Sequence, residues 1–215
     1  MTPRVNGARV AARGAATPWW QVGGATCIAA YQPKGAADLA ASYVNLANPG
    51  TYNAAPGVAP TLAAGGWSFN GSTQYLLSPL YLHGTTHSVI VRVAAVTNGG
   101  HAFGTFSGLV YQLVPKAAGG IEYRTSITYT IAPQCTDGVV AMVPASGGYR
   151  DGIYETPIAA VAAASGVTLA IGARNNAGAF QGLLAGTIVA MAIYSDNPAT
   201  VATNIVALTT RMQAL

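Results

Sequence analysis

Charged side chains are scarce in this sequence. Its 215 residues include 10 Lys and Arg and 6 Asp and Glu, so 7% of the chain is charged, where about 25% is usual in a globular domain. Arg4, Arg9 and Arg13 lie close to the N-terminus, and the other basic residues form no cluster. Because a phosphate-binding face needs a basic cluster, we expect no nucleic-acid partner.

Long hydrophobic runs, a secretory signal and cysteine motifs are also missing. The apolar stretch 182–194 is too short to cross a bilayer as a helix, and the stretch 156–173 is interrupted by Pro157 and by glycines, so we expect no membrane span. The N-terminus is too polar for a signal peptide, which leaves assembly inside a cell or earlier removal of a signal. Cys27 and Cys135 are far apart and not in a CxxC motif, which favours two buried thiols, leaves a disulfide open and argues against zinc.

Alternation of apolar and polar residues dominates the chain from residue 67 onward. The stretch 120–132 is the clearest case, because Ile121, Tyr123, Ile127, Tyr129 and Ile131 share one face of a single expected strand. Further strands are expected within 86–96, 108–114, 137–143 and 167–173. The dipeptide Asp151-Gly152 predicts a hairpin at 147–155.

The C-terminus changes to a helical period. After a cap at Asp196 or Asn197, apolar residues recur at intervals of three and four, which predicts one amphipathic helix over 198–215.

The sequence as a whole has many short strands, frequent turns and no alternation of strands with helices. This pattern predicts an all-β, antiparallel jelly-roll β-sandwich. We expect an extended N-terminal arm at 1–24 and one domain at 25–215, with a short helix inside 35–47.

Several motifs resemble those of laminin-G-like, concanavalin A-like jelly-roll domains. The stretch "WSFNGSTQYL" (67–76) resembles the family's aromatic–Gly–Tyr corner, in which Trp67 and Phe69 share one side and Asn70-Gly71 turns the chain. The stretches 87–93, "YRDGIYE" (149–155), 169–182 and 186–200 resemble later strands in the family's order, and 27–52 resembles its opening strand and connector. The resemblance covers about residues 27–200 and implies a concanavalin A-like sandwich of the kind carried by bacteriophage virion proteins. The chain departs from it at Val189 and Ala190, where polar residues are usual, and in its longer C-terminal helix.

Candidates for catalysis and metal binding are few. Glycosidases on such a fold need two carboxylates around the scissile bond, and no two of the six acids lie at i, i+2 on a strand. His83, His87 and His101 have no acid nearby, and calcium needs six to eight oxygen ligands. We therefore expect no enzyme activity, no catalytic residue, no bound metal and no cofactor.

Two polar loops remain as sugar-binding candidates, against the alternative that their residues serve only as turns. They contribute Tyr149, Arg150, Asp151, Arg174, Asn175 and Asn176.

The scarcity of charged residues also indicates that neighbouring protein chains cover much of the surface. We therefore expect a homo-oligomer or contacts with other virion proteins, through Trp19, Trp20 and Val189.

Two functions follow. The first is a non-enzymatic structural or adhesive virion component, such as a decoration, fibre or receptor-binding protein that is assembled in the host cytoplasm and binds itself, other virion proteins or a surface glycan. The alternative is an extracellular carbohydrate-binding module of a secreted bacterial protein.

Overall fold

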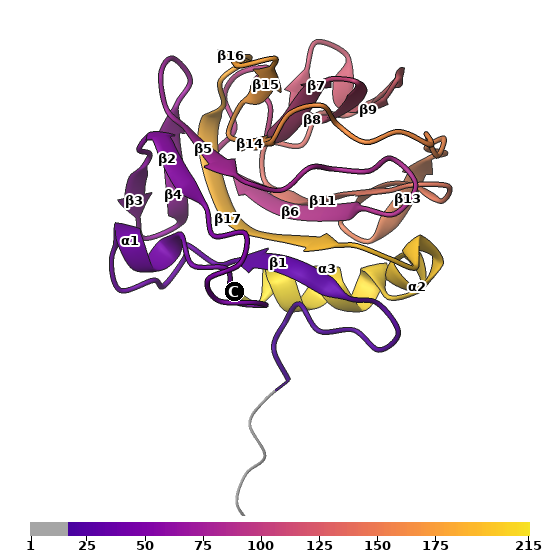
Figure 1. The fold of residues 1–215 in the computed structure, drawn as a ribbon, viewed down its shortest axis with the longest axis horizontal. Coiled ribbons are helices and arrows are strands. Elements are labelled where there is room, and N and C mark those ends of the chain that lie inside the picture. The colour runs from indigo at the N-terminus through magenta and orange to yellow at the C-terminus, as the bar shows by residue number, and fades with distance from the viewer. Residues whose placement is uncertain (1–16) are drawn as a thin grey trace, which may run out of the picture.

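The computed structural model describes residues 17–215, so residues 1–16 of the predicted arm (1–24) lie outside the described residues. The chain forms two sheets that face each other across a common core (Figure 1). Within residues 17–215, the strands pair antiparallel except for one parallel contact, between β15 and β7. The predicted all-β sandwich is therefore confirmed.

Sheet A has eight strands, in which β1 joins β17 beside β4. In spatial order they are β13 (Ile153–Thr156), β12 (Gly147–Arg150), β11 (Gly138–Val143), β6 (Ser88–Ala94), β17 (Ala185–Tyr194), β4 (Gly66–Asn70) and β3 (Thr61–Ala63), with β1 (Cys27–Tyr31).

Sheet B has nine strands, in which the short hairpin β15–β16 joins the sheet at β7. In spatial order they are β10 (Ile127–Ile131), β9 (Gly120–Thr125), β8 (Leu109–Ala117), β7 (Phe103–Ser107), β14 (Leu169–Ile171), β5 (Tyr75–Ser78) and β2 (Ala55–Val58), with β15 (Arg174–Asn176) and β16 (Ala179–Gln181).

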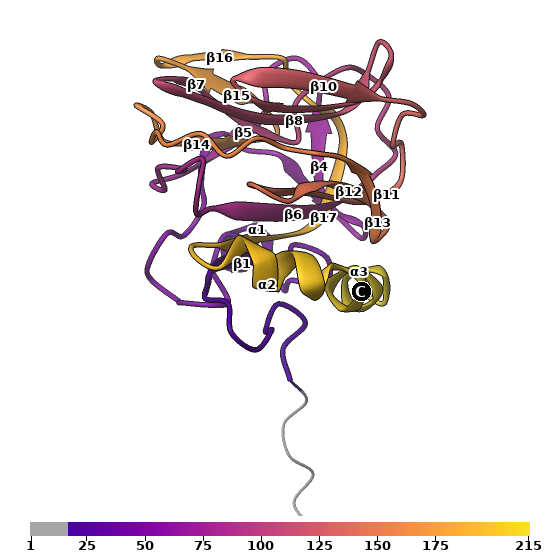
Figure 2. The same ribbon diagram turned by 90° about the vertical axis from the view of Figure 1, so that its right-hand side faces the viewer.

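Three helices complete the fold of the described residues: α1 (Leu39–Ser42), α2 (Pro198–Thr203) and α3 (Ile205–Gln213). No helix of residues 17–215 is long and apolar enough to cross a membrane. Figure 2 shows α2 and α3 below sheet A, on the side away from sheet B. Their buried side chains pack with Ile90, Ala190 and Tyr194 from the outer face of sheet A. The molecule thus has three layers, and one broad side of the sandwich is covered by its own chain.

The corner at 67–76 joins the two sheets, as β4 belongs to sheet A and β5 to sheet B. Trp67 and Phe69 both point into the core between the sheets. The Asn70 side chain accepts hydrogen bonds from the backbone N–H groups of Ser72 and Thr73 at 3.0 Å. These bonds, with Gly71 at φ 73°, fix the change of direction that the sequence predicts.

The single strand expected at 120–132 is wrong, since the chain reverses at Ser126, which has φ 77°. β9 and β10 form a hairpin, with Thr128 opposite Arg124 and Tyr129 opposite Tyr123. Tyr123 is buried as predicted, whereas Ile127 is 55% exposed. The alternation continues through the turn because opposite residues of a hairpin share a face of the sheet.

The single C-terminal helix is also corrected. It is divided at Asn204, whose side-chain amide donates to the carbonyl of Thr200 at 2.9 Å. Asn197 occupies the N-cap position without a side-chain capping bond, while the Asp196 carboxylate accepts a bond from the Thr26 hydroxyl at 2.9 Å. The predicted apolar positions are buried in both helices nonetheless.

Candidate ligand-binding face

The outer face of sheet B is the broad side of the sandwich that no helix of the described chain covers (Figure 2). Along β8 and β9, Tyr111, Leu113 and Tyr123 point into the core. The intervening residues therefore point outward, and the register places Gln112 directly opposite Arg124. Polar side chains of neighbouring strands consequently meet on this face.

Two arginines gather around one aromatic ring on this face. The guanidinium carbon of Arg174 lies 4.5 Å from the centre of the Phe106 ring, and that of Arg124 lies 5.5 Å from it. Arginine over an aromatic face is a favourable cation–π arrangement. The ring thus holds two cationic side chains from different strands next to each other.

Amide side chains hold Arg174 in place further. Arg174 Nη2 donates to Gln181 Oε1 at 2.6 Å, and its Nη1 donates to Gln112 Oε1 at 3.4 Å. Gln112, only 2% exposed, donates from Nε2 to Glu122 Oε1 at 2.7 Å. We call this set of contacting side chains the arginine cluster: Phe106, Gln112, Glu122, Arg124, Arg174 and Gln181.

The arginine cluster carries two guanidinium groups and one carboxylate, so its local charge is positive. Burial, and next the charge of Arg124, lower the pKa of Arg174. The Nε atoms of both arginines are buried without a hydrogen-bond partner in the described chain. These two Nε atoms are closed off from solvent, so a bound group would instead meet the terminal Nη atoms of the guanidinium groups, which pair with oxygen acceptors. The cluster is therefore suited to bind hydroxyl or carboxylate groups.

His101 is buried near this region, at 7% exposure, with its Nδ1 3.0 Å from the carbonyl oxygen of Gly182. Its Nε2 has no partner among the described residues. Burial lowers the pKa of His101, and the nearby Arg174 acts in the same direction. The imidazole is consequently neutral at pH 7.

The predicted loop at 172–178 contributes Arg174 directly to the arginine cluster. Asn175 is buried, and its side chain donates to the carbonyl of Thr168 and accepts from the N–H of Gly178, both at 2.9 Å. The amide of Asn176 reaches Gln181 Oε1 at 3.5 Å. Asn175 thus holds the turn, whereas Arg174 and Asn176 lie at the polar surface.

The other predicted group, Tyr149, Arg150 and Asp151, lies in sheet A, away from the arginine cluster, in the confirmed hairpin β12–β13. Tyr149 is buried beneath the helices, and its hydroxyl lies 2.7 Å from the Ser146 hydroxyl. The Asp151 carboxylate accepts from the N–H of Val139 at 2.9 Å. The structure therefore does not bring the two predicted loops together.

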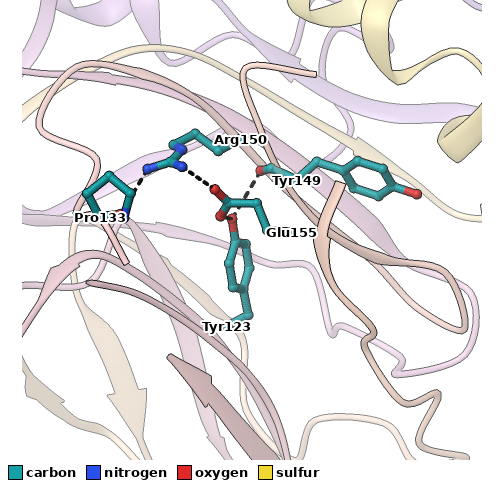
Figure 3. A network of polar contacts seen from close by, with 5 residues as sticks. All are labelled: Tyr123, Pro133, Tyr149, Arg150 and Glu155. Atoms are coloured by element: carbon teal, nitrogen blue, oxygen red, sulfur yellow. Dashed lines mark hydrogen bonds and ion pairs between the residues drawn. The ribbon is translucent and has the colours of Figure 1, made fainter. Parts of the chain in front are cut away.

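Arg150 lies at the partly exposed end of a buried network that joins the two sheets (Figure 3). Its Nη2 lies 2.5 Å from Glu155 Oε1, and its Nη1 donates to the carbonyl of Pro133 at 2.9 Å. The Tyr123 hydroxyl donates to Glu155 Oε2 at 3.0 Å. Burial first, and then Glu155, raise the pKa of Tyr123, so its phenol stays protonated. The network thus links sheet A to sheet B with its groups already paired.

The proposed assembly residues are packed within the chain. Trp19 is buried against the outer side of sheet A, and its Nε1 donates to Gln32 Oε1 at 2.9 Å. Trp20 packs edge-on against Trp19 at 5.5 Å between ring centres. Val189 is 3% exposed. Whether residues 1–24 form a separate arm stays a prediction, as does the assembly role of these three residues.

Metal ligands do not gather in the described part of the chain, where no three His, Cys, Asp or Glu residues are placed around one position. His87 Nδ1 instead accepts from the N–H of His83 at 2.7 Å. Cys27 and Cys135 are both free thiols, so the open question of a disulfide is settled.

The sequence contained a signal for part of the arginine cluster. Alternation places Glu122 and Arg124 on one face, away from the core. Nothing in the sequence indicates that Phe106, Gln112 and Gln181 come together, because their proximity depends on the order of the strands in sheet B.

No protein-family model and no curated protein matches this chain. Among solved structures, it is similar to domain 4 of AbnA, a GH43 extracellular arabinanase from Geobacillus stearothermophilus, determined in complex with arabinotriose. That match has 17% identity and a TM-score of 0.54 and covers 86% of this chain and 98% of the other. A Trypanosoma rangeli sialidase matches with 13% identity and a TM-score of 0.46, over 70% of this chain and 29% of the sialidase. The likeness to the arabinanase domain supports the β-sandwich fold.

Proposed function

We propose that this chain is a non-catalytic glycan-binding domain and that the arginine cluster is its binding surface. The observation that carries this proposal is the meeting of Arg124 and Arg174 over Phe106, on the broad face left open by the helices. Amide and guanidinium donors held by neighbouring side chains are suited to the hydroxyl groups of a sugar, because their geometry is set before binding.

The charge of the cluster favours an acidic glycan. Two guanidinium groups face one carboxylate, Glu122, and that carboxylate already accepts a bond from Gln112. Arginine binds carboxylates through two parallel N–H bonds, which lysine cannot do. A sugar with a carboxylate, such as a uronic acid, is therefore the preferred ligand class.

The similar arabinanase domain supports sugar binding as the general function, since its structure contains arabinotriose. Glycan binding serves equally well in a receptor-binding protein of a virion and in a module of a secreted bacterial protein. The location of the protein and its partners in a virion thus remain proposals.

The absence of catalysis is part of this proposal. Glu122 is the one carboxylate of the arginine cluster, whereas glycosidases place two carboxyl groups about 5–9 Å apart around the bond. Glu155 is paired with Arg150 in the buried network. We expect no release of reducing sugar from a panel of polysaccharides, and release above that of a heat-treated control would contradict this part.

A glycan array followed by titration calorimetry tests the binding surface. We expect binding to uronic-acid glycans, weakened roughly 10-fold or more by Arg174→Ala and by Arg124→Ala, since each removes a charge-assisted bond worth about 1.5–3 kcal/mol. Arg211→Ala is the matched control, because Arg211 lies on the helix side, where it donates to the carbonyl of Gln21. Absence of binding across the array, or binding that survives both cluster substitutions, would overturn the proposal.

A further inference from the structure

Strand β10 forms one edge of sheet B. Its residues pair with β9 on one side, and no strand of the described chain pairs with the other side. In Figure 2, β10 lies in the foreground of the upper layer. An edge strand directs every second N–H and C=O group outward, and these groups form a template for another strand.

The other edges of the two sheets carry features that hinder strand pairing. The pairing of β1 with β17 contains a shift in register, and β16 has only three residues. β2 contains Pro56 and a shift in register, and β3 has only three residues. β13 carries Glu155, follows a register shift in β12 and ends before Pro157. Prolines, irregularities, short length and charge all discourage edge-to-edge association. β10 has none of them over its five residues, Ile127–Ile131.

The sequence of β10, Ile-Thr-Tyr-Thr-Ile, reads the same in both directions about Tyr129. An antiparallel pair of two such strands centred on Tyr129 places each residue opposite one of its own kind. Ile127 then faces Ile131 of the second copy, and Thr128 faces Thr130. Pairs of β-branched residues across two strands are favourable. The strand is therefore complementary to itself under a two-fold rotation.

We propose that two copies of this chain associate through antiparallel pairing of β10 with β10, with Tyr129 at the two-fold axis. The partner strand takes up the outward backbone groups and covers Ile127, which is 55% exposed in one copy. This inference stands on the edge strand and does not depend on glycan binding.

The pairing also joins the two B sheets into one continuous sheet. Thr128 shares the outer face with Arg124, directly opposite it in the register. A two-fold axis perpendicular to the sheet keeps this face on the same side in both copies. The dimer consequently presents two arginine clusters side by side on one surface, an arrangement suited to repeating polymers.

Sedimentation velocity and light scattering on the full chain over a concentration series test the association. We expect a dimer of about twice the chain mass of 21.7 kDa. Thr128→Lys/Thr130→Lys places like charges opposite each other, and we expect it to weaken the dimer at least ~100-fold. Val58→Lys, on the edge strand β2, is the matched control and should remain dimeric.

A cysteine at the axis tests the register separately. In the proposed dimer, Tyr129→Cys faces itself at a Cα separation of roughly 4.5–5.5 Å, within the range of a disulfide. We expect mild oxidation to cross-link this variant into dimers, and Thr128→Cys, which faces Thr130, to cross-link far less. A wild-type monomer at all concentrations, or a dimer that survives the lysine pair with Tyr129→Cys uncross-linked, would overturn the proposal.

Discussion

Replacing Glu155 by alanine tests whether the buried network holds the two sheets together. The side chain of Glu155 is 6% exposed and that of Arg150 is 24% exposed. Removing one partner of a buried ion pair costs roughly 3–5 kcal/mol, because the other charge stays without compensation. Arg150 keeps its bond to the carbonyl of Pro133 and partial contact with water, so we expect a loss of about 3 kcal/mol, the lower end of that range.

Two further variants separate charge from hydrogen bonding. Glu155→Gln keeps an acceptor for the Tyr123 hydroxyl and loses the ion pair, so we expect a loss of about 1–2 kcal/mol. Arg150→Met/Glu155→Met removes both charges at similar volume, and we expect it to be less destabilised than Glu155→Ala. The difference between the double variant and the sum of its two single variants, Arg150→Met and Glu155→Met, measures the coupling.

Urea unfolding followed by tryptophan fluorescence is the appropriate assay, with the slope of the transition checked for each variant. A loss below about 1 kcal/mol for Glu155→Ala would refute the reasoning, since that is the range of exposed ion pairs. A double variant as unstable as the sum of the single ones would refute the coupling.

Three other predictions follow from burial. Burial lowers the pKa of His87 and His101, so the unfolded chain takes up protons before the folded one does, and the free energy of unfolding falls as the pH drops below about 6.5. Melting curves should therefore give a lower melting temperature at pH 5 than at pH 7.5, and His101→Gln should reduce this difference in melting temperature. Burial raises the pKa of Cys27 and Cys135 to about 12, which leaves a thiolate fraction of about 10⁻⁴ at pH 8. Iodoacetamide should therefore modify the two thiols only when urea unfolds the chain, and rapid labelling of the folded protein would contradict this prediction. Trp19→Ala should lower the free energy of unfolding by about 3–5 kcal/mol through lost packing, and a change under 1 kcal/mol would show that Trp19 does not stabilise the fold.

The sequence predicted the β-sandwich better than it predicted where individual strands and helices begin and end. The hairpin β12–β13 was predictable because Asp151 and Gly152 both adopt positive φ, which this dipeptide favours. The reversal at Ser126 was not, because serine gives no comparable signal and the alternation is the same on both sides of the turn. In the helices, apolar spacing is likewise continuous across Asn204 and gives no sign of the interruption.

The candidate binding face was predicted only in part. The loop at 172–178 supplied Arg174, and alternation placed Arg124 on an outward face. Their meeting over Phe106 depends on the pairing of β15 with β7, which a local pattern cannot specify. Tyr149 was misleading for the same reason, since the helices that bury it come from a distant part of the chain.

The three-layer arrangement has a practical consequence for attachment. The C-terminus lies on the helix side of the molecule, and the described chain also starts on that side, whereas the arginine cluster lies on the far side of the sandwich (Figures 1 and 2). A tether fused after Leu215 would therefore leave the outer face of sheet B directed away from whatever holds the protein. Immobilised in this orientation on a sensor chip or a particle, the domain would display its candidate glycan surface outward.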